Sequence, residues 1–88
     1  MAEAEGKGVQ AFILVEAKAG TTLEVSRETS KVDGVIASYA VTGPFDVIVH
    51  AEAADIKSLA QIVVAKIQAL DSVVRTLTCI VLESSRGK

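Results

Sequence analysis

The stretch that decides the fold covers residues 39–49 and reads Tyr-Ala-Val-Thr-Gly-Pro-Phe-Asp-Val-Ile-Val. Apolar side chains recur at every second position on both sides of the Gly-Pro pair, and a period of two is typical of β-strands. Gly43 is open to backbone angles that other residues avoid, and Pro44 fixes its own φ angle. We therefore predict two paired strands, over residues 35–42 and 45–52, joined by a stiff corner. The corner fits either an ordinary tight turn or a loop shaped to approach a small molecule.

Two helices and two more strands are predicted around this hairpin. Residues 9–17 are apolar at nearly every position, which indicates a central strand covered on both faces. Residues 21–32 are predicted to form a weakly amphipathic helix, with Thr21 as N-cap and Glu24 completing a capping box. Asp55 is the predicted N-cap of the second helix. Apolar residues keep helical spacing along that helix at Ile56, Leu59, Ala60, Val63, Ile67 and Leu70.

The last strand is predicted over residues 73–82, which are rich in β-branched side chains. The order β-α-β-β-α-β consists of two similar halves, because residues 31–35 and 69–73 each lead from a helix into a strand. Right-handed crossovers in both halves give an α+β, ferredoxin-like fold, in which a four-stranded antiparallel sheet carries both helices on one face.

That fold leaves one face of the sheet bare. The first and last strands carry apolar residues on both faces, and a chain of 88 residues is too small to fold back over its own sheet. A large exposed apolar patch is a usual mark of a protein partner. We therefore predict a homodimer packed sheet to sheet, of the dimeric α+β-barrel type, whose free edges allow larger assemblies. The alternative is a monomer with an apolar surface.

Length and composition bound the class of protein. Half of the 88 residues are hydrophobic, which suits one domain, predicted over residues 9–82, with flexible tails at 1–8 and 83–88. The net charge is −2 and the nine basic residues are scattered, which argues against direct nucleic-acid binding. The sequence has neither an apolar run of the roughly 20 residues that span a membrane nor an export signal. The single cysteine, Cys79, is predicted to be a buried strand thiol, and a cytoplasmic location is expected.

The polar side chains of the hairpin do not form a recognisable catalytic or metal motif. His50 shares a strand face with Asp46 and Glu52, but such a row is longer than one metal ion with ligands at about 2 Å can bridge. A solvated polar stripe is therefore predicted, with no metal and no cofactor. No motif places a nucleophile beside a base, so we predict no enzyme. Tyr39 with Asp46 is the one pair left open.

Two hydroxyl groups on the last strand suggest a binding site instead. Thr76 and Thr78 are two residues apart, so they point to the same face, where each hydroxyl can both donate and accept. Threonine also simply suits a strand, and that interpretation stays open. The Asp46 carboxylate can accept bonds from an ammonium group, and the backbone at Gly43 can bind a carboxylate. Together these groups outline a site of the size of an amino acid.

Four segments in this order carry a family resemblance: Ala11-Phe12-Ile13-Leu14-Val15, Val32-Asp33-Gly34-Val35, Val41-Thr42-Gly43-Pro44-Phe45-Asp46 and Arg75-Thr76-Leu77-Thr78-Cys79-Ile80-Val81-Leu82. The most specific elements are the Thr-Gly-x-aromatic-Asp corner and the Arg-Thr-x-Thr strand. Over residues 9–82 the chain resembles the effector-binding domain of the Lrp/AsnC transcription regulators, the RAM domain (regulation of amino acid metabolism).

This resemblance implies a non-enzymatic domain that binds an amino acid effector. It also implies dimers formed through the sheets and stacked into octamers or related rings, with effector sites between dimers. The implied ligand contacts are Tyr39, Val41, Thr42, Gly43, Phe45, Asp46, Thr76 and Thr78. Family regulators carry a helix-turn-helix before this domain, whereas eight residues precede the first predicted strand here. A stand-alone domain is therefore expected, which senses an amino acid or co-assembles with a full-length regulator and contacts neither nucleic acid nor membrane.

Two other functions stay open. A small dimeric α+β-barrel enzyme of the monooxygenase or isomerase type shares this topology and would use His50, Tyr39 or Asp46. Its pocket would lie between sheet and helices beside His50, whereas an effector site would lie between dimers at the Gly43 corner. A purely structural interaction module would assemble without any ligand.

Overall fold

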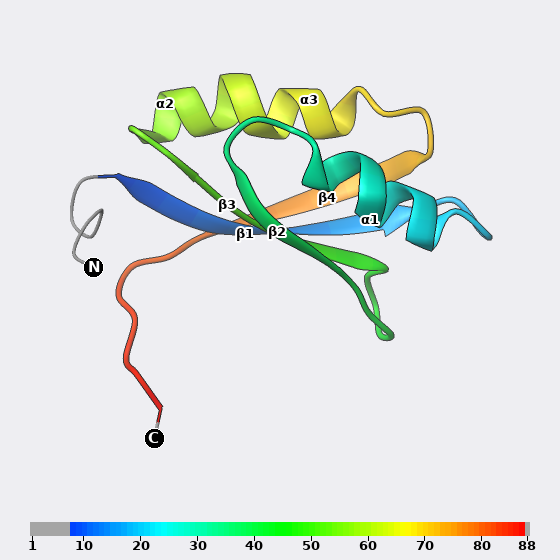
Figure 1. Ribbon diagram of the computed structural model, residues 1–88, viewed down its shortest axis with the longest axis horizontal. Coiled ribbons are helices and arrows are strands. Elements are labelled where there is room, and N and C mark those ends of the chain that lie inside the picture. Colours follow the sequence, from blue (N-terminus) through cyan, green and yellow to red (C-terminus); the bar gives the residue numbers. More distant parts are fainter. Residues whose placement is uncertain (1–7, 88) are drawn as a thin grey trace.

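The computed structural model describes residues 8–87. Its strands are β1 (Val9–Ala17), β2 (Val35–Ala40), β3 (Val47–Ala53) and β4 (Val73–Ile80). They form one antiparallel sheet in the order β2-β3-β1-β4. Its helical segments are α1 (Thr22–Ser30) and a continuous run of α2 (Ile56–Ser58), η1 (Leu59–Val64) and α3 (Ala65–Gln68). Both lie on one face of the sheet (Figure 1), so the predicted α+β, ferredoxin-like fold is confirmed.

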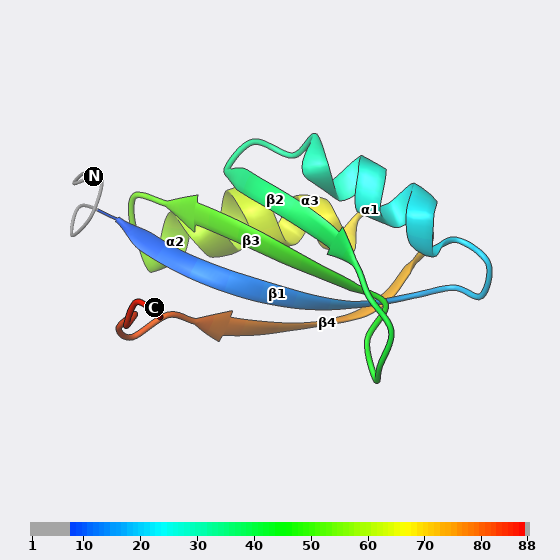
Figure 2. The ribbon, with the colours of Figure 1, turned by 60° about the horizontal axis from the view of Figure 1, so that its bottom comes forward.

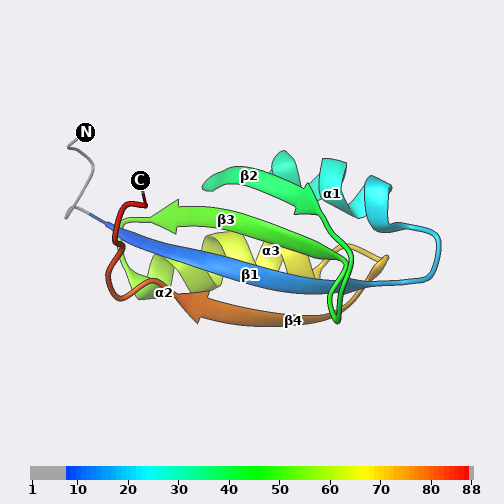
Figure 3. The same ribbon diagram turned by 90° about the horizontal axis from the view of Figure 1, so that it is seen from below.

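The core forms where β1 and β3 face the helices. Strand β1 lies between β3 and β4, as predicted for a central strand, and Ile13 and Val15 on its helix-facing side are fully buried. Phe12 and Leu14 alternate with them and point to the other face, where Phe12 is 37% exposed. Figure 3 shows this face from below, with the helices behind the sheet. Only one face of β1 is therefore covered within the protomer.

The second helical run meets the core along one row of side chains. Leu59, Val63 and Ile67 are buried, as their spacing predicts. A strict spacing of four would drift by about 40° per step in an α-helix of 3.6 residues per turn. The wider π-helical turns of η1 offset that drift, which keeps all three side chains on the sheet. Asp55 caps the run as predicted, accepting a hydrogen bond from the Ser58 amide at 2.7 Å.

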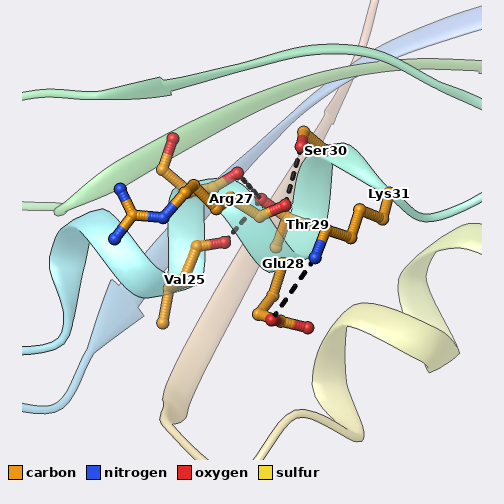
Figure 4. Close-up of polar contacts among 7 residues, drawn as sticks. Val25, Arg27, Glu28, Thr29, Ser30 and Lys31 are labelled. Atoms are coloured by element: carbon orange, nitrogen blue, oxygen red, sulfur yellow. Dashed lines mark hydrogen bonds and ion pairs between the residues drawn. The ribbon is translucent and has the colours of Figure 1, made fainter.

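Helix α1 differs from its prediction at both ends. Thr21 does not form the capping box: its φ of −113° and ψ of 9° lie outside the extended region typical of an N-cap, and its hydroxyl donates to the Lys18 carbonyl at 2.7 Å. The helix ends at Ser30 rather than near residue 32. Inside it, the fully buried Thr29 donates to the Val25 carbonyl at 2.8 Å (Figure 4). The Thr29 hydroxyl also lies 2.9 Å from that of Ser38, which ties α1 to β2.

The two halves of the chain do repeat each other. After α1, the Val35 amide donates to the Val32 carbonyl at 3.0 Å, and after α3 the Val73 amide donates to the Leu70 carbonyl at 3.1 Å. Each turn leads into an edge strand whose register shifts near its first residues. Such irregularities keep exposed edges from pairing with other chains.

The strand ends and the cysteine need correction. The hairpin strands β2 and β3 are shorter than predicted, because residues 41–46 form a loop. Strand β4 ends at Ile80 rather than residue 82. Cys79 is exposed rather than buried, because it lies across from Phe12 on the open face. Residues 1–7 and 88, expected in the tails, lie outside the described residues. Among residues 8–87, no helix has the length and apolar character needed to cross a membrane.

Two glycines with positive φ angles allow a matched test of packing behind β2. Gly34 has a φ of +96°, and a Cβ there would lie 2.8 Å from Val63 Cγ2 and 3.1 Å from the Glu52 carbonyl oxygen. Gly20 has a φ of +82° with open space around it. We expect Gly20→Ala to lose about 1–2 kcal/mol from backbone strain, and Gly34→Ala to lose about 1–3 kcal/mol more from the clash. Urea unfolding measures both, and equal losses would contradict the close packing of Gly34 on η1.

The Asp55 cap predicts a pH dependence. Hydrogen bonds from the backbone and side chain of Ser58 hold the pKa of the Asp55 carboxyl below its ordinary value. The charge therefore stabilises the fold above the unfolded pKa of about 3.9 and ceases to do so as the pH falls through the lowered folded pKa. Asp55→Asn keeps a capping oxygen without titrating. In unfolding experiments between about pH 5 and pH 2, Asp55→Asn should lose less stability than the wild type, and parallel losses would contradict the assignment.

Candidate functional site: the open sheet face and the hairpin corner

Apolar side chains form a band across the open face of the sheet. The strand register aligns Tyr39, Ile48, Leu14 and Leu77 in one row across all four strands. The neighbouring row holds Ala37, His50, Phe12 and Cys79. Polar pairs lie beyond both rows, with Gln10 beside Glu52 at one end and Glu16 bonded to Arg75 at 3.1 Å at the other. An apolar centre with a polar rim is the usual composition of a protein interface.

The hairpin loop, residues 41–46, borders a hollow at one end of this band. The hollow has a volume of about 450 Å³. Its walls come from the two central strands and the loop: Leu14, Val41, Thr42, Pro44, Phe45 and Ile48. The guanidinium carbon of Arg75 lies 5.1 Å from the centre of the Phe45 ring, a cation–π contact beside the hollow.

Asp46 anchors the loop to the central strand. Its carboxylate Oδ2 accepts a hydrogen bond from the Ala17 amide at 2.8 Å, and its own amide donates to the Val15 carbonyl at 2.9 Å. The Val41 amide closes the base of the loop by donating to the Asp46 carbonyl at 2.9 Å. The Asp46 carboxylate, which was expected to bind the ammonium group of a ligand, thus accepts a hydrogen bond that holds the loop on β1.

The other expected ligand residues divide between the two faces of the sheet. Val41, Thr42 and Phe45 meet at the hollow, and Gly43, with a φ of +142°, lies exposed at the tip of the loop. Tyr39 is 53% exposed on the open face. Thr76 and Thr78 share a face as predicted, but they pair with Val15 and Ile13 and so lie on the helix side. The Thr76 hydroxyl accepts a bond from the Gln68 amide nitrogen at 2.8 Å.

One protomer therefore does not bring all eight candidates into one pocket. The sequence missed Leu14, Pro44 and Ile48 as walls of the hollow. The period-two alternation places Leu14 and Ile48 away from the buried residues, but their meeting under the loop depends on the strand register, which alternation alone does not fix.

The imidazole on the open face is held by a stack rather than by carboxylates. The ring of His50 lies parallel to that of Phe12, with centroids 4.5 Å apart and an interplanar angle of 13°. Its Nε2 is 2.9 Å from Oε1 of Gln10. Within residues 8–87 no group of three or more His, Cys, Asp or Glu side chains could hold a metal ion. His50 thus lies on the face away from the helices, and not between sheet and helices as the enzyme alternative requires.

Comparison with known proteins settles the family. The family model described as "Lrp/AsnC ligand binding domain" matches residues 10–86. The chain belongs to the Lrp/AsnC ligand-binding domain family. The predicted resemblance is therefore confirmed. No curated protein sequence matches the chain significantly.

Several solved structures share this fold. FFRP-DM1 is 34% identical with a TM-score of 0.77, and the match covers 84% of this chain and 99% of that one. The hypothetical protein PHS023 from Pyrococcus horikoshii is 33% identical with a TM-score of 0.77, over 86% and 92% of the two chains. AsnC from E. coli is 25% identical with a TM-score of 0.82, over 94% of this chain and 56% of that one.

A further neighbour is a complex with an amino acid. The transcriptional regulator NMB0573 from Neisseria meningitidis, in complex with L-Met, is 25% identical with a TM-score of 0.78. The match covers 92% of this chain and 54% of the regulator. This Lrp/AsnC domain thus spans about half the length of the two regulators it matches.

The anchoring role of Asp46 is open to a direct test. We expect Asp46→Ala to lose about 1.5–3 kcal/mol, the range for a hydrogen bond to a charged group, because the part-buried Ala17 amide loses its acceptor. Asp46→Asn keeps an acceptor oxygen and should lose less. Urea midpoints at constant m-value report the difference. Wild-type stability of Asp46→Ala would show that the carboxylate is free for a ligand.

Proposed function

We propose that this domain is a non-enzymatic amino-acid sensor. The main support for this proposal is the match of the Lrp/AsnC ligand-binding family to residues 10–86. The related regulator in complex with L-Met supports a free amino acid as the class of ligand. The function follows from differential binding, because a ligand shifts an assembly only by the difference between its affinities for the two states.

The proposed effector site is built around the hairpin corner. The Thr42 hydroxyl and the exposed backbone at Gly43 supply hydrogen-bonding groups that suit a carboxylate, and Phe45 supplies an apolar wall. Tyr39, Val41 and Asp46 complete this side of the site. Thr76 and Thr78 lie on the opposite face of the sheet, so in this proposal they act from a neighbouring subunit. The site is thus formed between subunits.

The proposed assembly starts from a homodimer packed sheet to sheet. The apolar rows of the open face include Leu77, which is 49% exposed, Tyr39 at 53% and Phe12 at 37%. Contiguous exposure of this kind favours a protein partner. We further propose that dimers associate into an octamer or a similar ring. The chain matches about half of E. coli AsnC, so co-assembly with a longer regulator is proposed as the route by which an effector signal reaches DNA.

Thermal unfolding in the presence of each of the twenty amino acids tests the proposal. A ligand at about 100 times its Kd adds roughly 2.7 kcal/mol of stability, which moves the midpoint of a domain of this size by several degrees or more. We expect selective shifts from one or a few amino acids. Thr42→Val should reduce that shift while leaving the ligand-free midpoint nearly unchanged, and Leu23→Ala on α1 serves as the control. Uniformly absent shifts in the assembled protein would refute amino-acid sensing.

A further inference from the structure

Two segments project from the open face of the sheet. In Figure 1 the hairpin loop, residues 41–46, and the C-terminal segment, residues 81–87, both lie on the side away from the helices. Figures 2 and 3 show them at opposite ends of the strands. We call residues 81–87 the C-terminal arm. It leaves the sheet beside the start of β1, where the Val81 amide donates to the Gln10 carbonyl at 2.9 Å.

The arm carries an apolar side chain away from the sheet. Leu82 is 97% exposed, and it follows Ile80, which ends β4 opposite the buried Ala11 on the helix-facing side and is 36% exposed. A single exposed leucine needs no explanation in general. This leucine lies on an arm that projects from the face that the proposed dimer would bury.

Symmetry limits how two open faces can stack. A two-fold axis along the strands would keep both loops at one end of the stacked sheets and both arms at the other, so that no arm would meet a loop. A two-fold axis across the strands would place the arm of each copy beside the hairpin loop of the other. Every contact then occurs twice, as in an isologous interface. Contact between an arm and a hairpin loop therefore requires the axis across the strands.

The arm has the reach and the chemistry for the hollow beside that loop. Stacked sheets lie about 10 Å apart, and two extended residues beyond Ile80 advance about 7 Å, so the side chain of Leu82 arrives at the facing sheet. The hollow of about 450 Å³ is lined mainly by apolar side chains. Glu83 follows Leu82, and Arg75, which also pairs with Glu16, lies over Phe45 at the side of the hollow, so Glu83 and Arg75 carry opposite charges.

We propose that the C-terminal arm of one copy inserts Leu82 into the hollow of the second copy, between its hairpin loop and its open sheet face. The hollow is then a docking site completed by the partner copy. Effector recognition is then left to the outer side of the corner, at Thr42 and Gly43, and Phe45 serves the docking site rather than the effector site. This inference rests on the sheet-to-sheet dimer of the proposed function and not on amino-acid binding.

Disulfide trapping between two distinguishable copies tests the proposal. Both copies carry Cys79→Ser, which removes the exposed thiol on the open face. One copy carries Leu82→Cys and a size tag, and the other carries Thr42→Cys on the wall of the hollow. The copies are mixed in mild denaturant, returned to buffer, oxidised and separated on a non-reducing gel. We expect a cross-link of mixed size. Leu23→Cys on the helix side, 63% exposed, replaces Leu82→Cys in the control and should give none with Thr42→Cys.

Each other result overturns the proposal in a distinguishable way. A strong Leu82→Cys self-cross-link would place arm against arm, with the axis along the strands. Dimeric elution on gel filtration without the mixed cross-link would support the dimer but show that the arm does not dock in the hollow. Monomeric elution would contradict both the dimer and the docked arm. Amino-acid binding is measured separately by thermal shift.

Independently, Leu82→Asp should weaken dimerisation by about tenfold or more and Leu23→Asp should not. Equal effects would contradict docking.

Discussion

The structure depends on one constraint, which is that four apolar strands form a single sheet while the helices cover only one side of it. Strand β1 shows most clearly that only one face of the sheet is covered. Ile13 and Val15 are fully buried against the helices, whereas Phe12 and Leu14, which alternate with them, face outward. Burying one such side chain contributes about 1.5–3 kcal/mol. A second layer over the open face would remove these side chains from water, and in the proposed dimer a second copy of the same face supplies that layer.

The hairpin corner is oriented by that same central strand. Asp46 binds the Ala17 amide through its side chain and the Val15 carbonyl through its backbone, so the loop is fixed relative to β1. The hollow beside the loop then opens toward the face where a partner is expected. In this account the Lrp/AsnC corner has two sides, an inner apolar side for subunit contact and an outer polar side for the effector.

The sequence predicted those elements whose signal is continuous along the chain. The bounds of β1 agree with the largely apolar run of residues 9–17, and the buried row of the second helical run follows its spacing. Local signals were less reliable where the backbone conformation decides the outcome. Thr21 had the sequence of a capping box, but its hydroxyl donates to the Lys18 carbonyl and accepts no hydrogen bond from the helix. The π-helical turns of η1 were not predicted, because a spacing of four is compatible with either helix type.

The candidate site was predicted less completely because it depends on register and on which face is covered. Alternation placed Thr76 and Thr78 on one face, but only the pairing of β4 with β1 shows that this is the helix side. The same pairing puts Cys79 on the open face and exposes it. Asp46 was identified as important, whereas its bond to Ala17, which lies 29 positions away, requires the tertiary structure.

The mass of the protein in solution tests the central claim that a second copy covers the open face. Sedimentation equilibrium of the wild type should give at least twice the chain mass of 9.2 kDa. Leu14→Asp, which places a charge in the centre of the open face without touching the core, should shift the protein toward the monomer while its circular dichroism stays folded. A wild type that stays monomeric at high concentration would contradict the account.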